Sequence, residues 1–117
     1  MNDTSQEVQV ETFAGSRPGV TVIKVTGPLT IRNFFDFQAQ TRNHKSPVLI
    51  IDLGQVPYLD SAALGSLLRV HVSCGKNNRK YGLVNVNDRL KTMFTVTGVA
   101  DVLMTFPNVA EAEAALA

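Results

Sequence analysis

The run VLIIDL, at residues 48–53, constrains the fold of this chain more than any other segment. Its first four residues are all apolar, so the run offers no polar face to water. A strand of this kind is stable only when other parts of the protein cover both of its faces. Pro47 stands directly before the run and marks its start. We therefore predict a central strand that is covered on both faces.

The remaining segments alternate between strand-like and helix-like patterns. Strands are predicted where apolar positions alternate or β-branched residues are dense, at residues 8–13, 20–26, 81–86 and 102–106. Helices are predicted at residues 32–42 and 61–77, after a cap at Asn87 or Asp88, and after Asn108, which Glu111 follows three residues later. Gly15, Pro18 and Gly19 separate the first two strands and favour a hairpin.

The order of these elements predicts one α/β domain over residues 1–117. After the hairpin, each helix lies between two strands, which implies right-handed crossovers and parallel pairing. We expect a mixed, four- to five-stranded sheet with about four helices packed against it. Residues 1–7 are polar and are expected to form a flexible tip.

Composition disfavours several classes of function. Hydrophobic residues make up 44% of the chain and charged residues 18%, which is typical of a globular protein. Lysine and arginine (11) nearly balance aspartate and glutamate (10), so direct nucleic-acid binding is not expected. The first residues lack the pattern of a secretory signal, and the apolar runs are too short for membrane insertion. Because Cys74 is the single cysteine, we expect a reducing, cytoplasmic location.

The helix predicted at residues 61–77 carries a narrow polar stripe at Ser66, Arg69, Ser73 and Lys76. Spacings of three and four residues place these side chains on one face, which we expect to be solvated. The rest of the circumference is mostly apolar and includes Leu64, Leu67, Leu68, Val70, Val72 and Cys74. The helix is therefore expected to be largely buried.

The pair Asp60-Ser61 stands at the start of this helix, after a turn at Pro57. The first N–H groups of a helix have no backbone partner, and the helix dipole favours negative charge there. Phosphorylation of a serine at this place would add about −1.5 to −2 charges, which the helix can tolerate. Asp and Ser are also common helix caps, and capping alone explains most such pairs.

Three segments resemble the STAS domains of bacterial anti-sigma factor antagonists. The first, VPYLDSAALGSLLRVHVSC, contains Asp60-Ser61 and resembles the family's signature at the start of a helix. The second, VTVIKVTGPLT, resembles the family's second strand and its Gly-x-Leu turn. The third, LVNVNDRLKTMFTVTGVADVLMTF, resembles the later strand, the third helix and its F-x-x-T-G ending. The segments follow the family's order and cover most of the chain, which implies a single STAS-like domain.

The resemblance implies a regulator of transcription and not an enzyme. In that family the unphosphorylated protein binds a kinase, of the histidine-kinase-like ATPase type, that is itself the anti-sigma factor, and so releases the sigma factor. The kinase phosphorylates the serine that corresponds to Ser61, and a separate phosphatase resets the switch. By the same resemblance, Asp60 is expected to orient the hydroxyl of Ser61 or to cap the helix. The expected partner-binding residues are Thr30, Asp60, Ser61, Ala62, Leu64 and Gly65. The resemblance implies no cofactor and no metal.

The chain departs from the family pattern at three positions. Ala62 stands where a second Ser or Thr is frequent, so no second phosphorylation site is expected there. Ala63 replaces a frequent glycine and stiffens the start of the helix. Thr30 stands where an acidic residue often follows the Gly-x-Leu turn, so we expect the partner surface to differ from that of typical members.

The sequence leaves one other class of function open and disfavours a second. Some STAS relatives are subunits of membrane transport assemblies for lipids or anions, and these act as structural partners without phosphorylation. A small hydrolase is disfavoured, because no glycine stands two residues before Ser61 and the two histidines follow no catalytic pattern.

Three other groups of residues have structural explanations. His71 and Cys74 lie three residues apart but are too few to hold zinc, so a buried pair is expected. A cluster near a helix C-terminus carries positive charge that the dipole favours, and it comprises Lys76, Arg79 and Lys80. An aromatic cluster is expected to belong to the core with at most one exposed ring, and it comprises Phe34, Phe35 and Phe37.

Overall fold

Strand β3 (Val48–Gln55) lies at the centre of a five-stranded sheet. The structure is a computed structural model that describes residues 8–117. The other strands are β1 (Gln9–Ala14), β2 (Val20–Thr26), β4 (Lys80–Val84) and β5 (Thr105–Phe106), in the spatial order β1-β2-β3-β4-β5. Strands β1 and β2 pair antiparallel as the predicted hairpin, whereas β2 to β5 pair parallel. The sheet is therefore mixed, as predicted.

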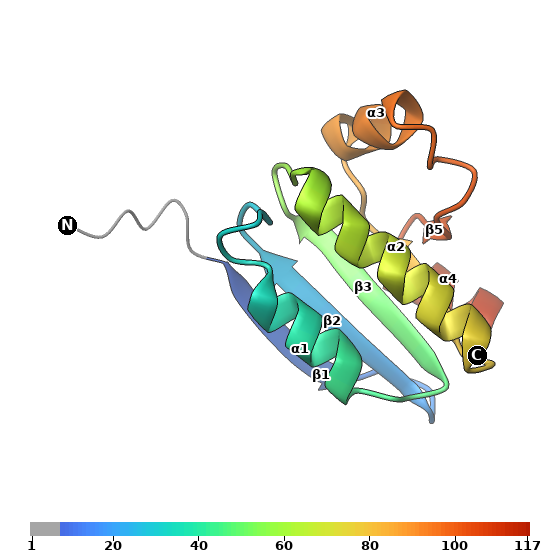
Figure 1. Ribbon diagram of the computed structural model, residues 1–117. Coiled ribbons are helices and arrows are strands. Elements are labelled where there is room, and N and C mark those ends of the chain that lie inside the picture. The colour runs from blue at the N-terminus through green and yellow to red at the C-terminus, as the bar shows by residue number, and fades with distance from the viewer. Residues whose placement is uncertain (1–7) are drawn as a thin grey trace.

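Alternate side chains of β3 belong to two separate cores. The helices are α1 (Phe35–Asn43), α2 (Ser61–Lys76), α3 (Asp88–Val96) and α4 (Val109–Leu116). Val48 and Ile50 pack in the core that α4 covers, and Leu49 and Ile51 pack in the core beneath α1 and α2. Figure 1 shows α4 behind the sheet and α1 and α2 in front of it. Both isoleucines are fully buried, which confirms that β3 is covered on both faces.

The first helix begins at Phe35, three residues later than predicted. Residues 31–34 form a turn, which the side chain of Asn33 stabilises. Its Oδ1 accepts a hydrogen bond of 2.8 Å from the N–H of Thr30, and its Nδ2 donates one of 2.8 Å to the carbonyl of Pro28. Side-chain bonds of this kind compete with helical hydrogen bonds, which explains the later start.

The last strand is shorter than predicted and comprises only Thr105–Phe106. The N–H groups of Val102 and Leu103 both bond to the carbonyl of Val99, so this stretch is a turn and not a strand. The tip predicted at residues 1–7 lies outside the described residues. Among residues 8–117, no helix combines the length and the apolar character needed to cross a membrane.

A buried carboxylate joins helix α4 to the turn of the β1–β2 hairpin. Glu113 is only 4% exposed, and its Oε2 accepts a hydrogen bond of 2.7 Å from the hydroxyl of Ser16. Its Oε1 accepts a second bond of 3.1 Å from the N–H of Arg17. A Cβ atom at Gly15 would lie 2.6 Å from Oε1 of the same carboxylate and 2.8 Å from Cβ of Val20, so a larger residue there would displace these groups. The Ser16 hydrogen bond is the main cause that lowers the pKa of Glu113, against the opposing effect of burial.

The two-sided burial of β3 predicts a severe effect of Ile50→Asp. An unpaired carboxylate would enter a core position that is fully buried, and we expect the free energy of unfolding to fall by about 4 kcal/mol. Urea unfolding followed by circular dichroism measures this change. Val96→Asp is the control, because Val96 is 80% exposed and should change stability by less than about 1 kcal/mol. A parent-like midpoint for the Ile50 variant would contradict the central position of β3.

The Glu113 contact predicts a pH dependence of stability. A pKa that folding lowers means that the ionised form is the stabilising one. Its contribution is present above the ordinary pKa of glutamate and is lost as the pH falls through the lowered pKa. Glu113→Gln should therefore be less stable than the parent near neutral pH, and the difference should shrink in acid. Glu11→Gln removes the same charge at an exposed residue. It should therefore have the melting temperature of the parent at every pH.

Candidate functional site

The loops that follow β2 and β3 lie side by side at the carboxyl ends of these parallel strands. An isolated bridge pairs Leu29 with Leu59. The N–H of Leu29 donates to the carbonyl of Tyr58 at 3.1 Å, and the N–H of Asp60 donates to the carbonyl of Leu29 at 3.2 Å. The beginnings of α1 and α2 therefore lie at the same end of the sheet (Figure 1). This end brings together residues that are about 30 positions apart in the sequence, a common location for sites in α/β proteins.

Asp60 ties the two loops together with one carboxylate. It is the N-cap of α2, and its Oδ1 accepts a hydrogen bond of 2.9 Å from the N–H of Ala63. Its Oδ2 accepts a bond of 2.8 Å from the N–H of Ile31, in the loop after β2. Of the two roles expected for Asp60, the structure shows the capping role. It adds a contact that the sequence did not reveal, since Ile31 lies 29 residues away.

Ser61 is the first residue of α2, and its side chain is exposed. Its hydroxyl forms no hydrogen bond with any described residue. The first turn of α2 contains no acidic residue after the Asp60 cap. An exposed and unbonded hydroxyl at a helix N-terminus is accessible to a modifying enzyme, and the helix dipole favours a phosphate there.

The other expected partner-binding residues differ in exposure. Gly65 is exposed one turn after Ser61, whereas Thr30 and Ala62 are half-buried. Leu64 is 6% exposed and packs in the core beneath α1 and α2. Its side chain supports α2 from the inside and offers little surface to a partner.

Two exposed apolar side chains lie on the segment that Asp60 holds. Ile31 is 54% exposed and Phe35 is 63% exposed, whereas Phe34 and Phe37 are buried. The sequence predicted at most one exposed ring in this cluster, and that ring is Phe35. The spacing of four residues between Ile31 and Phe35 predicts that both lie on one side of a helix, although Ile31 itself precedes α1.

His71 and Cys74, which were expected to be a buried pair, differ in burial: His71 is half-buried and Cys74 is buried. Nδ1 of His71 lies 2.8 Å from the hydroxyl of Tyr81, and the two rings meet edge to face. Cys74 is 2% exposed in the core, where burial raises the pKa of its thiol and the charge of Arg79 partly opposes that effect.

Comparisons with known proteins give a consistent family. A sequence model described as STAS domain matches residues 14–112. The anti-sigma-B factor antagonist of Listeria monocytogenes is 36% identical over 56 residues, which are 48% of this chain and 49% of that protein. The match thus spans about half the length of this curated relative.

Two solved structures illustrate how widely the fold is shared. A putative anti-sigma factor antagonist from Thermotoga maritima has a TM-score of 0.83 at 16% identity, over 92% of this chain and 93% of that one. A sulfate transporter family protein from Wolinella succinogenes has a TM-score of 0.69 at 22% identity, over 85% of each chain. At these identities the likeness is one of fold alone.

The two bonds of Asp60 predict a clear loss of stability for Asp60→Ala. The substitution leaves the N–H groups of Ala63 and Ile31 without their acceptor, and we expect a loss of about 2 kcal/mol. Hydrogen exchange at the amide of Ile31 should accelerate as well, which a capping role confined to α2 would not cause. Ser61→Ala removes no hydrogen bond and should stay within about 0.5 kcal/mol of the parent. Unchanged exchange at Ile31 would contradict the link between the loops.

Proposed function

The chain belongs to the STAS domain family, and from that premise we propose that it is an anti-sigma factor antagonist controlled by phosphorylation of Ser61. In its unphosphorylated form it binds a kinase-type anti-sigma factor in the cytoplasm, and this binding releases the sigma factor for transcription. The same kinase phosphorylates Ser61 and ends the binding, and a phosphatase restores it. The chain itself is the substrate and partner of enzymes and catalyses no reaction.

The observation that carries this proposal is the state of the Ser61 hydroxyl. It is exposed, it has no hydrogen bond to a described residue, and it lies at the N-terminus of a sixteen-residue helix. Asp60 is the residue that caps α2, so capping does not explain why a serine stands at position 61. The curated relative is named as an anti-sigma-B factor antagonist, which agrees with a regulatory role.

A phosphate on Ser61 would change the surface without requiring a new fold. It adds about −1.5 to −2 charges next to the carboxylate of Asp60, at a place where the helix dipole partly compensates them. A partner that covers this surface would have to desolvate the phosphate or would be repelled by its charge, and either effect weakens binding. Exposed Ile31 and Phe35 give such a partner an apolar contact, and Gly65 leaves the surface of α2 open to close approach.

A second candidate is a structural subunit of a membrane transport assembly. The likeness of fold to a sulfate transporter family protein favours it, because that protein shares the domain over 85% of its chain. In this case the surface at Ser61 would bind its partner permanently and would need no phosphorylation.

Binding and phosphorylation by the cognate kinase-type anti-sigma factor distinguish the candidates. With ATP, intact-mass analysis should find one phosphate, and fragmentation should place it on Ser61. In calorimetric titrations without ATP, Ser61→Ala should bind like the parent and Ser61→Glu at least about tenfold more weakly, a penalty of about 1.4 kcal/mol. Ala110→Glu is the charge control, because it lies on α4 at the opposite face of the sheet and should bind like the parent.

Two outcomes would contradict the switch. Phosphorylation at another residue would remove Ser61 from its role. Equal affinities of the parent, Ser61→Ala and Ser61→Glu would leave the structural-subunit candidate standing, which copurification with transporter components would then support.

A further inference from the structure

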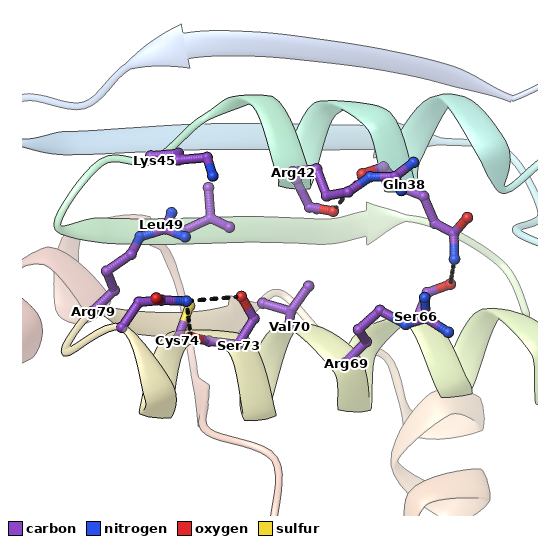
Figure 2. A pocket seen from close by; sticks show the side chains of 12 residues that line it. Gln38, Arg42, Lys45, Leu49, Ser66, Arg69, Val70, Ser73, Cys74 and Arg79 are labelled. Atoms are coloured by element: carbon purple, nitrogen blue, oxygen red, sulfur yellow. Dashed lines mark hydrogen bonds between the residues drawn. The ribbon is translucent and has the colours of Figure 1, made fainter.

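A pocket of about 370 Å³ opens between α1 and α2, with β3 beneath it. Figure 2 shows Gln38 and Arg42 on the α1 side and Ser66, Arg69 and Ser73 on the α2 side. The volume lies at the lower end of the range of small-molecule sites. Ser66, Arg69 and Ser73 belong to the polar stripe that the sequence predicted to be solvated, whereas Lys76 of that stripe does not line the pocket.

Burial corrects the prediction for one residue of that stripe. Ser66 is only 4% exposed, and its Oγ accepts a hydrogen bond of 3.2 Å from Nε2 of Gln38 across the pocket. Val72, which was counted with the buried residues of α2, is instead 53% exposed. Ser66 therefore faces α1, whereas Arg69 and Lys76 of the same stripe are exposed as predicted and Ser73 is half-buried.

The pocket is lined by four cationic side chains and, among its described lining residues, by no acidic one. The cations are Arg42, Lys45, Arg69 and Arg79. Within residues 8–117 none of them forms an ion pair. Arg42, Lys45 and Arg69 are exposed and Arg79 is half-buried, so the rim of the pocket carries positive charge that is in contact with solvent.

Structural roles explain only part of this charge. Arg79 donates from Nε to the carbonyl of Ser46 at 2.8 Å and from Nη2 to the carbonyl of His44 at 2.7 Å, so it secures the chain after α1. Arg42 lies in the last turn of α1, where the dipole favours cations, and Lys45 follows the end of α1 by two residues. Arg69 lies in the middle of α2, too far from either end for the dipole to explain it.

The floor and the walls differ in chemistry. Leu49, Val70 and Cys74 are buried apolar residues that line the pocket. The hydroxyls of Thr41 and Ser73 and the guanidinium groups lie around this floor. A ligand that fits has a small apolar body for the floor and an anionic group for the rim.

We propose that this pocket binds a small organic phosphate that has an apolar ring or short chain. Arg42, Lys45 and Arg69 are engaged by no residue within 8–117, and a phosphate dianion matches such a rim better than a carboxylate with a single charge does. Arginine forks bind phosphate oxygens by two parallel hydrogen bonds, and Arg42 and Arg69 project from facing helices. This site is separate from Ser61 and does not depend on the proposed function.

Phenyl phosphate is the probe, and amide chemical shifts of the labelled protein are the readout. We expect saturable shifts confined to α1, α2 and the start of β3. Phenol carries the same ring without the charge, and inorganic phosphate carries the charge without the ring. Each should bind at least about tenfold more weakly than phenyl phosphate, because each lacks one of the two contacts. Equal binding of inorganic phosphate would overturn the organic part of the proposal, and equal binding of phenol would overturn the anionic part.

Matched variants test the rim. Arg69→Gln and Arg42→Gln should each weaken phenyl phosphate by about tenfold, as the loss of a charge-assisted hydrogen bond requires. Lys91→Gln makes the same change in net charge at an exposed residue of α3 and should stay within about twofold of the parent. Ser61→Ala should bind the probe like the parent, so failure here is distinguishable from failure of the switch. Absence of saturable shifts, or equal affinity of Arg69→Gln and Lys91→Gln, would overturn the site.

Discussion

The burial of β3 on both faces is the constraint on which the rest of the structure depends. Because Ile50 and Ile51 point to opposite faces and are both fully buried, helices must cover each face of the sheet. Parallel neighbours of β3 follow, since each crossover contains a helix. The loops after β2 and β3 then leave the sheet at the same end, and only there can Asp60 reach the N–H of Ile31. The candidate partner site is thus a consequence of the core.

Asp60 and Ser61 divide two tasks between adjacent residues. Asp60 supplies both the cap of α2 and the bond to the neighbouring loop, so the local geometry does not need the hydroxyl of Ser61. A residue without a structural task can be modified at little cost to folding, because no buried contact is lost. The two hydrogen bonds of Asp60 also tie the start of α2, where Ser61 lies, to the segment that carries Ile31 and Phe35. Under the proposed function, this separation would allow a change of charge at Ser61 to alter binding while the domain itself stays folded.

The elements that depend on local pattern were predictable, whereas long-range contacts were not. Strand β2, the start of α2 and the centre of the sheet follow from β-branched runs, capping residues and the run in β3. The start of α1 and the length of β5 depend on hydrogen bonds of Asn33 and Val99 that local periodicity does not encode. Asp60-Ser61 was identified from the sequence, but the bond to Ile31 spans 29 residues. The polar stripe of α2 was identified as well, and only the position of α1 shows that it borders a pocket.

Helix α2 carries two candidate sites, one at its N-terminus and one on the side that faces α1, and they differ in the charge that they favour. The distance between them determines how strongly they influence each other. The N-terminal place accepts added negative charge at Ser61, while the side that faces α1 gathers cations. Arg69 lies eight residues beyond Ser61, which corresponds to about 12 Å of helix rise. The Debye length is about 8 Å at physiological ionic strength, so solvent screens most of the interaction between charges at these two places. A phosphate on Ser61 would therefore act on a partner that covers the end of the helix and only weakly on an anion beside its middle.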